Sequence, residues 1–518
     1  MKFFYAAIAL GLLVLPWLNP FAPGPSPGVM PWLVSVCSVG GLLLIALPLT
    51  ALNVNSSHKT QSIWPSLFGH AILIAGLSSS VLGLLQYADY EAAFVPWINV
   101  TEPGYAFANL RQRNQFASLT NMALAALIWL ATSMGTVRRL DARQSMLLLA
   151  AAALAIGNSA SSSRTGLVQI VLLCALCGVW GLWRQRLIRR VLLSAVLAYA
   201  LATVVLPWLA GFDLSLHGMA ARLRTGDEAC SSRITLWSNV LHLIAQKPWL
   251  GWGWGELDYA HYMTLYKGPR FCEILDNAHN LPLHLAVELG VPVALLVCGG
   301  FSWWVLRQRP WREGDPTRQL AWTVLAVILL HSMLEYPLWY GPFQMAFGLC
   351  LLMLWRTREP LAELTEELKN ESNSLWSPVS QALAAIFLIV GVAYAAWDYH
   401  RISQIYLAPE QRDAAYRDDT LAKIQGSWLF ANQARFAELL LTPLTRDNAR
   451  WTFNTATTLL HYSPEPRIIE KTIESAVMLG LDDEALAQLT RYQAAFPQDS
   501  ARWSQANAKL PMNLQSLK

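Results

Sequence analysis

A histidine that could act as a general base stands directly before an apolar stretch, in the segment Asp276-Asn-Ala-His279-Asn280-Leu-Pro282. Pro282 suits the first turn of a helix, and Asn280 can cap the unpaired N–H groups of that turn. His279 is therefore expected just before a helix at the edge of a membrane, where a neutral imidazole can take a proton from an attacking hydroxyl group. The alternative interpretation is a histidine that only caps a helix at an interface.

Three arginines could bind an anion: Arg113 in RQRNQF, Arg164 in SSSRTG and Arg233 in SSRITLW. A guanidinium at the mouth of a membrane protein is costly unless it meets an anion, and its planar fork matches two phosphate oxygens. Each arginine alone could simply extend to a lipid headgroup. Together they favour a shared ligand such as a pyrophosphate on a lipid tail, whose departure a cationic clamp would stabilise. With His279 as the base, this set predicts glycosyl transfer.

Acidic residues add a positioning group, and the sequence shows no metal-binding motif. Glu335 and Tyr336 are expected at the outward end of a span, where they could position either substrate, and Glu335 could orient His279. His279 and His284 are five positions apart and do not share a helix face as zinc ligands would. Neither an HExxH motif nor an outward DxD pair is present, so we expect chemistry without a metal or cofactor. As an alternative, acidic loop residues could converge in space: Asp227, Glu228, Glu256, Asp258, Glu273 and Asp276.

The elements that must position these residues are apolar helices. Of the 518 residues, 54% are hydrophobic and only 14% are charged, and the mean hydropathy is +0.33. This composition predicts an all-α polytopic membrane protein, with about eleven segments of the length that crosses a bilayer. The first segment resembles a signal peptide but lacks a cleavage site, so it is expected to be a retained span. The segments are 3–18, 31–51, 66–86, 116–137, 145–160, 165–183, 190–210, 284–306, 319–338, 341–355 and 380–398.

Basic residues orient these spans. Four basic connections fall on one side of the membrane if the spans alternate, and Lys2 and Lys59 join them, which predicts a cytoplasmic N-terminus and an outward C-terminus. The loop 211–283 then faces outward. The four connections contain Arg138, Arg139 and Arg143; Arg184, Arg186, Arg189 and Arg190; Arg307, Arg309, Arg312 and Arg318; and Arg356, Arg358 and Lys369.

Two of the seven cysteines, Cys230 and Cys272, lie in this outward loop. In an oxidising compartment they are expected to form a disulfide bond that holds the loop, and the alternative is two free thiols.

Composition changes after Trp397, which predicts a transmembrane domain over 1–398 and an outward helical domain over 399–518. Within the second domain, the segments 435–444, 449–461, 467–479 and 483–496 show helical periodicity. Helix pairs of this length resemble tetratricopeptide-type repeats, although simple helical packing also explains the pattern.

The motifs SSSRTG, SSRITLW, GWGWG, DNAHNLPLHLAVELG and HSMLEYPLWYGPF occur in this order. In this order and topology, the chain resembles the O-antigen ligase and polymerase superfamily over about residues 100–400. Within it, the chain is most similar to the bacterial protein O-oligosaccharyltransferases, also called pilin glycosylation ligases. The resemblance implies a multi-pass protein of the bacterial inner membrane, with the catalytic loop and C-terminal domain in the periplasm.

The resemblance also implies an activity and roles for residues. Members of the family that this chain resembles transfer a preassembled glycan from undecaprenyl pyrophosphate to Ser or Thr hydroxyls of exported proteins such as type IV pilins. His279 matches the essential loop histidine and expected base, and Arg164 and Arg233 match arginines that engage the donor. Gln115 and Tyr336 match further family positions.

Three alternatives stay open. An O-antigen ligase that acts on lipid A-core, or a glycan polymerase, would share the donor and differ in the acceptor, but the extension 399–518 favours a protein acceptor. A lipid flippase or transporter would place charges in the middle of spans and repeat its halves, and neither pattern is found. A structural scaffold would leave the outward arginines and His279 without a reason.

Overall fold

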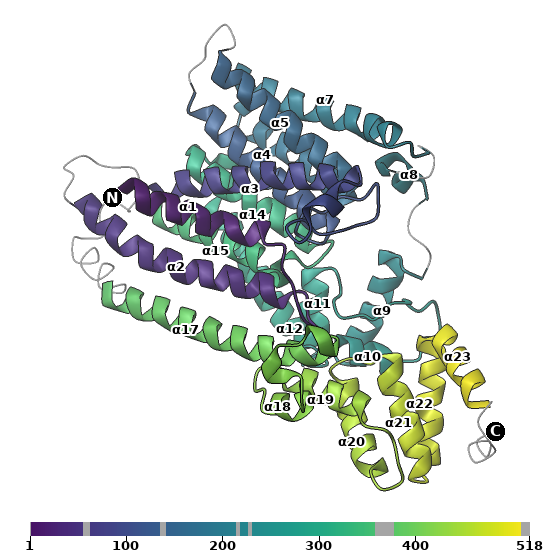
Figure 1. Ribbon diagram of the computed structural model, residues 1–518. Helices are drawn as coiled ribbons and strands as arrows, with labels where there is room; N and C mark the ends of the chain where they lie inside the picture. The colour runs from purple at the N-terminus through teal and green to yellow at the C-terminus, as the bar shows by residue number, and fades with distance from the viewer. Residues whose placement is uncertain are drawn as a thin grey trace. The chain divides into compact units, whose positions relative to one another are not determined.

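The computed structural model describes residues 2–54, 63–134, 141–213, 218–225, 230–357 and 378–508, and the regular structure of these residues is entirely helical. The chain divides into two compact units (Figure 1). The first contains Met1–Gly226 and Val305–Ala396, and the second contains Asp227–Trp304 and Trp397–Lys518. Most of the loop 211–283 thus belongs to the same unit as the C-terminal helices. Several residues used above lie outside the described ranges: Lys59, Arg138, Arg139, Asp227, Glu228, Arg358 and Lys369.

Each apolar segment expected from the sequence contains a helix among its described residues. Among the described residues, six helices are long and apolar enough to cross a membrane, and Phe3–Leu18 and Arg164–Val179 are shorter apolar helices. The number of spans beyond these six stays a prediction. The six candidates are Val29–Leu47, Ile63–Tyr87, Arg113–Thr132, Arg186–Leu209, Val291–Arg312 and Pro378–Tyr406.

The first unit is built around α4 (Arg113–Thr132), the most completely buried of the six candidate spans. This helix packs against α3 (Ile63–Tyr87), α5 (Ala142–Ala160), α6 (Arg164–Val179) and α14 (Pro316–Ser332). Small side chains permit this close packing. A Cβ on Gly76 of α3, for example, would overlap the methyl group of Ala123. The other α-helices described in this unit include α1 (Lys2–Leu18), α2 (Val29–Val54), α7 (Arg186–Leu209), α8 (Gly218–Thr225), α15 (Gly341–Arg356) and the first part of α17 (Pro378–Ser403).

The second unit joins the loop 211–283 to the C-terminal helices through shared apolar packing. Tyr262 of α10 (Leu257–Met263) is buried in one core with Leu459, Ile468 and Tyr492, and its hydroxyl donates a hydrogen bond to Gln488 Oε1 at 2.6 Å. The helices of this unit include α9 (Arg233–Gln246), α11 (Leu281–Leu289), α12 (Val291–Ala294), the first part of α13 (Gly300–Gln308), α18 (Thr420–Ile424), α19 (Ala431–Leu441), α20 (Ala449–Leu460), α21 (Pro466–Met478), α22 (Asp482–Ala495) and α23 (Pro497–Ala508).

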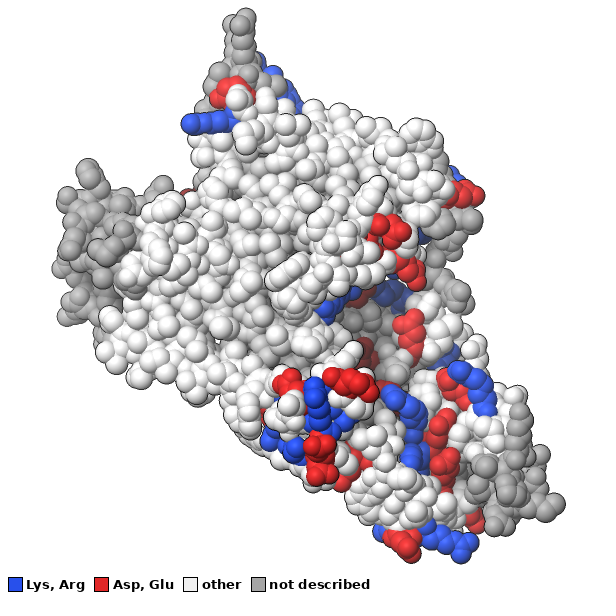
Figure 2. All heavy atoms as spheres, in the orientation of Figure 1, with Lys and Arg blue, Asp and Glu red and all other residues white. Residues whose placement is uncertain are grey.

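The C-terminal helices α20, α21 and α22 run side by side, each against the next in sequence (Figure 1). Their bounds lie close to the periodic segments read from the sequence, while membership in a repeat family stays a prediction. Figure 2 shows Lys, Arg, Asp and Glu gathered over these helices, whereas the surface over α1, α2 and α17 is almost free of charge. This contrast matches an aqueous environment for the former and a lipid environment for the latter.

The apolar segment 284–306, expected as one span, is not a single continuous helix, because α11 ends at Leu289. Gly290 follows with a φ of +89°, and a Cβ at this position would overlap the carbonyl group of Trp249. The backbone N–H groups of Trp252 and Gly253 donate to the carbonyls of Val287 and Glu288, each at 2.9 Å. The last carbonyls of α11 are therefore occupied by a loop segment, so the candidate span begins anew at Val291.

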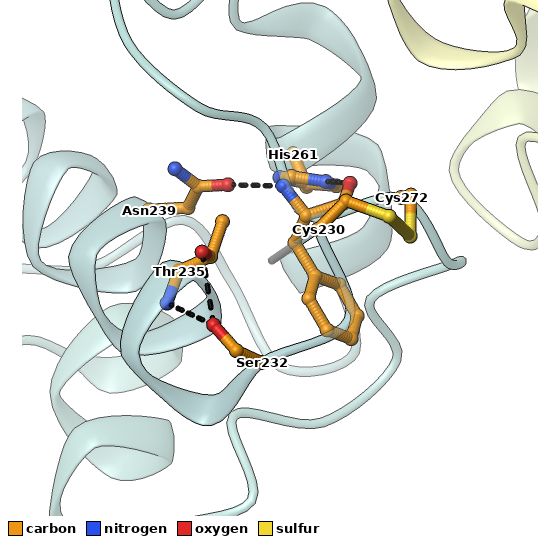
Figure 3. The surroundings of a disulfide bond; sticks show 7 residues. Cys230, Ser232, Thr235, Asn239, His261 and Cys272 are labelled. Atoms are coloured by element: carbon orange, nitrogen blue, oxygen red, sulfur yellow. Dashed lines mark hydrogen bonds between the residues drawn. A yellow bond between two sulfur atoms is a disulfide. The ribbon is translucent and has the colours of Figure 1, made fainter. Parts of the chain in front are cut away.

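The disulfide bond expected from the sequence is present between Cys230 and Cys272, whose Cα atoms are 5.3 Å apart (Figure 3). It connects the residue before the N-terminal turn of α9 to the segment that follows α10. Beside it, Phe271 N donates to Asn239 Oδ1 at 2.8 Å, and His261 Nε2 lies 3.1 Å from the Phe271 carbonyl. The bond thus closes a loop that side-chain hydrogen bonds also hold.

Cys272→Ser is expected to destabilise the second unit by about 3 kcal/mol, because the unfolded loop gains conformational entropy when its cross-link is lost. Limited proteolysis should show faster cleavage between α9 and α10. Cys37→Ser, which removes an exposed free thiol, serves as the matched control. Maleimide labelling of Cys230 and Cys272 in the unreduced protein would contradict the bridge.

Candidate functional site

His279 stands in a tightly built turn before α11. Its φ is +49°, a left-handed conformation that is uncommon for a residue with a Cβ, and its side chain is half-buried. Its N–H donates to Asn277 Oδ1 at 2.9 Å, and the carbonyl of Ala278 accepts a hydrogen bond from Trp237 Nε1 at 3.1 Å. Asn280 caps the helix as predicted, since its Oδ1 accepts from Leu283 N at 3.1 Å. The backbone on both sides of His279 is therefore fixed.

A buried pair in α11, ahead of the candidate span, supports this turn. His284 Nε2 and Glu288 Oε2 are 3.5 Å apart, and His284 Nδ1 lies 3.5 Å from the N–H of Ala278. Burial, and secondly the charge of His279, lowers the pKa of His284 to about 4. Burial raises the pKa of Glu288 to about 7. His284 is consequently neutral at neutral pH, with Nδ1 available as an acceptor for the loop backbone.

Arg233 is the first residue of α9. Ser232 caps this helix, and its Oγ accepts from Thr235 N at 3.2 Å. A helix N-terminus carries a partial positive charge that favours anions, so a cationic side chain placed there adds to an existing positive potential.

The same arrangement occurs twice in the first unit. Arg164 begins α6 after Ser163, whose Oγ accepts from Gly166 N at 3.0 Å. Arg113 begins α4 after Gln112, whose Oε1 accepts from Gln115 N at 2.6 Å. All three arginines identified in the sequence thus open a capped helix.

Two of these helix starts, those of α4 and α6, lie side by side. Ser163 Oγ donates to Asn114 Oδ1 at 2.5 Å, and Asn114 Nδ2 donates to Glu335 Oε1 at 3.1 Å. The three side chains are buried. Since Asn114 follows Arg113 and Ser163 precedes Arg164, the structure places the first residues of α4 and α6 close to Glu335.

Gln115 and Tyr336 flank this group. The side-chain oxygen of Gln115 is buried and has no hydrogen-bond partner among the described residues. Tyr336 is half-buried, and its ring lies 6.2 Å from that of Tyr340 in a nearly parallel orientation. The predicted contact between Glu335 and His279 joins residues of different units and stays a prediction.

The sequence reasoning missed several polar residues of this region. Asn114, Ser118 and Asn121 lie on one face of α4. One turn after Asn114, the Ser118 hydroxyl forms a hydrogen bond with His331 Nδ1 at 2.9 Å. Their spacing of four and three residues within an apolar helix is a signal that could have revealed them. Arg222 of α8 was missed as well, and its Nη1 donates to the Ser162 carbonyl at 2.9 Å. Within the described ranges, no cluster of three or more His, Cys, Asp or Glu side chains could hold a metal ion.

The buried carboxyl of Asp258 in α10 gives the second unit a pH dependence. Burial, assisted by the nearby carboxylates of Asp276 and Glu256, raises its pKa from 3.8 to about 7. The protonated form therefore stabilises the fold fully below pH 3.8, and this contribution is lost as the pH rises through about 7. Asp258→Asn should unfold like the wild type at acidic pH but at a higher temperature than the wild type at pH above this range. Thermal unfolding measures this, with exposed Asp483→Asn as the control, and equal unfolding temperatures at alkaline pH would contradict it.

Comparisons with known protein families cover most of the site. Residues 106–131 match a model described as protein glycosylation ligase, and residues 145–298 match one described as O-antigen ligase. Residues 319–511 match a model described as virulence factor membrane-bound polymerase, C-terminal. Arg113 and Gln115 fall in the first match, and Arg164, Arg233 and His279 fall in the second.

Two curated relatives come from Acinetobacter baylyi. The chain is 26% identical over 248 residues to a ComP-specific O-oligosaccharyltransferase. The aligned region covers 47% of this chain and 43% of that relative. It is 22% identical over 306 residues to a general O-oligosaccharyltransferase. This second aligned region covers 57% of this chain and 51% of that relative. The chain thus spans about half the length of the curated relatives it matches. The resemblance to protein O-oligosaccharyltransferases of the O-antigen ligase superfamily is confirmed.

Proposed function

We propose that this multi-pass membrane protein is a glycosyltransferase that moves a preassembled oligosaccharide from undecaprenyl pyrophosphate to Ser or Thr hydroxyls of periplasmic proteins, pilins among them. The relatives and the matching family models support the class of reaction. The structural observation that carries the proposal is that Arg113, Arg164 and Arg233 each begin a capped helix. Helix N-termini and guanidinium groups both favour phosphate oxygens.

In this mechanism, the arginines bind the pyrophosphate and stabilise the charge that it gains on leaving. The acceptor oxygen attacks the anomeric carbon of the first sugar. The bond from that carbon to the phosphate oxygen breaks, and its electron pair remains on the pyrophosphate. His279 takes the hydroxyl proton, which a neutral imidazole can do when its backbone is held in place. No step in this scheme uses a metal or cofactor.

The proposed setting is the bacterial inner membrane, with a cytoplasmic N-terminus and with the loop and C-terminal helices in the periplasm. Shared packing between α10 and the C-terminal helices supports a common compartment for these two segments. Asn280 and Glu335 would serve the site indirectly, by capping α11 and by holding Asn114.

The test uses bacteria that supply a lipid-linked oligosaccharide, a secreted pilin and a separate lipid A-core acceptor. Intact-protein mass and a lipopolysaccharide gel then report where the glycan goes. Glycan on the pilin, and none with His279→Ala, is the expected result. Glycan only on the lipid would assign the chain to the O-antigen ligases instead. If neither the pilin nor the lipid carries glycan, a donor-hydrolysis assay measures whether the protein releases glycan from the donor.

A further inference from the structure

Four large apolar side chains in the second unit are exposed and take no part in the site described above. On α9, Ile234 is 81% exposed and Leu241 is 54% exposed. In the segment that follows α9, Trp249 is 76% exposed and Leu250 is 86% exposed. We call these four residues the α9 apolar surface. Large apolar side chains that are exposed together mark a contact with protein or membrane.

The segment that carries Trp249 and Leu250 is attached to the start of a candidate membrane span. The carbonyl of Pro248 accepts a hydrogen bond from the N–H of Val291 at 2.8 Å. Val291 is the first residue of the span Val291–Arg312. Pro248, the residue before Trp249, is therefore hydrogen-bonded to the first residue of the candidate span. Tryptophan is enriched at the depth where membrane spans begin and end.

Helix α9 has the pattern of a helix that lies along an interface. Ile234 and Leu241 are seven positions apart and thus share one face, while Leu236, Val240 and Leu243 are buried in the core on another. Arg233 begins the helix and Lys247 follows its end, which suits the negative charge of lipid headgroups. Trp252 Nε1 donates to the Leu243 carbonyl at 3.1 Å, so the helix and the following segment are held as one piece.

We infer that the α9 apolar surface is immersed in the headgroup region of the bilayer, with α9 lying along the membrane. Immersion of this surface holds Arg233, the first residue of α9, at the depth of the lipid phosphate groups. The diphosphate of a lipid-linked donor lies at the same depth, and this consequence rests on the proposed function. The occupant of the surface is lipid.

The experiment places an environment-sensitive fluorophore on Leu250→Cys or Leu241→Cys, in a chain whose five unpaired cysteines are serine. The full-length protein is reconstituted in nanodiscs of ordinary or brominated phospholipid. A label on Leu486→Cys, an exposed leucine of α22 in the same unit, is the matched control. We expect brominated lipid to quench the labels at 250 and 241 several-fold more strongly than the label at 486.

Quenching at 250 and 241 no stronger than at 486 would overturn the inference. So would labels that are shielded only after an acceptor protein is added, since that outcome assigns the surface to protein docking. The measurement needs neither donor nor transfer, so it stands apart from the success of the proposed function. With transfer established, Leu250→Asp should raise the KM for the lipid donor several-fold and change kcat little, because the depth of Arg233 shifts while the chemistry is unchanged.

Discussion

His279→Ala is expected to lower the rate of glycan transfer by roughly 10²–10⁴-fold, the range that a general base contributes. The fold should persist, because the side chains of Asn277 and Trp237 hold the turn through hydrogen bonds to its backbone. These hydrogen bonds do not involve the imidazole. Transfer to a purified acceptor, followed by intact-protein mass, measures the rate. His242→Ala, which removes an exposed histidine of α9, is the matched control and should retain the wild-type rate.

His279→Gln separates two roles for the ring. Glutamine keeps a hydrogen-bond donor but cannot accept the proton of the attacking hydroxyl, so its rate should be as low as that of the alanine variant if His279 is the base. Recovery of most of the activity with glutamine would show that hydrogen-bond donation is sufficient. A wild-type rate in both variants would remove His279 from the reaction.

Arg164→Lys is expected to reduce kcat by about 10²–10³-fold, the effect of removing one group that stabilises developing negative charge. Lysine retains the charge but loses the planar fork that binds two phosphate oxygens at once. The Ser163 cap stays in place in this variant, so the start of α6 is preserved. Arg189→Lys, on the exposed start of α7, controls for an arginine that lies outside the site.

Single-turnover rates with a lipid-linked donor measure this effect. Arg233→Lys should behave like Arg164→Lys, because each arginine stands at the start of a capped helix. Wild-type rates in both variants would exclude a clamp on the pyrophosphate.

The helices could be predicted because their cause is local. A segment that is apolar for the thickness of a bilayer must satisfy its own backbone hydrogen bonds, so hydropathy alone locates it. The start of α11 was equally local, since Asn280 and Pro282 act on residues within one turn. The pairing of Cys230 with Cys272 followed because they are the two cysteines of the loop that the sequence predicts to face outward.

The features that the sequence did not reveal depend on distant residues. The break at Gly290 exists because the segment from Pro248 to Gly253 takes the place of the next helical turn. Asn114 meets Glu335 across 221 positions, and nothing within the motif RQRNQF indicates that partner. Single-chain patterns report neighbours along the chain, so contacts of this kind need the three-dimensional structure.

The packing of Tyr262 has a consequence for biosynthesis. Its core neighbour Tyr492 and its hydrogen-bond partner Gln488 are translated long after it, the latter 226 positions later. In the proposed topology, the segment Asp227–Trp304 is exported before the ribosome has made Val305–Ala396, and it then lacks the other half of its unit. His279, the proposed base, would therefore be held in an incomplete unit until synthesis is nearly finished, so a chain that is still being inserted would not consume the proposed donor early.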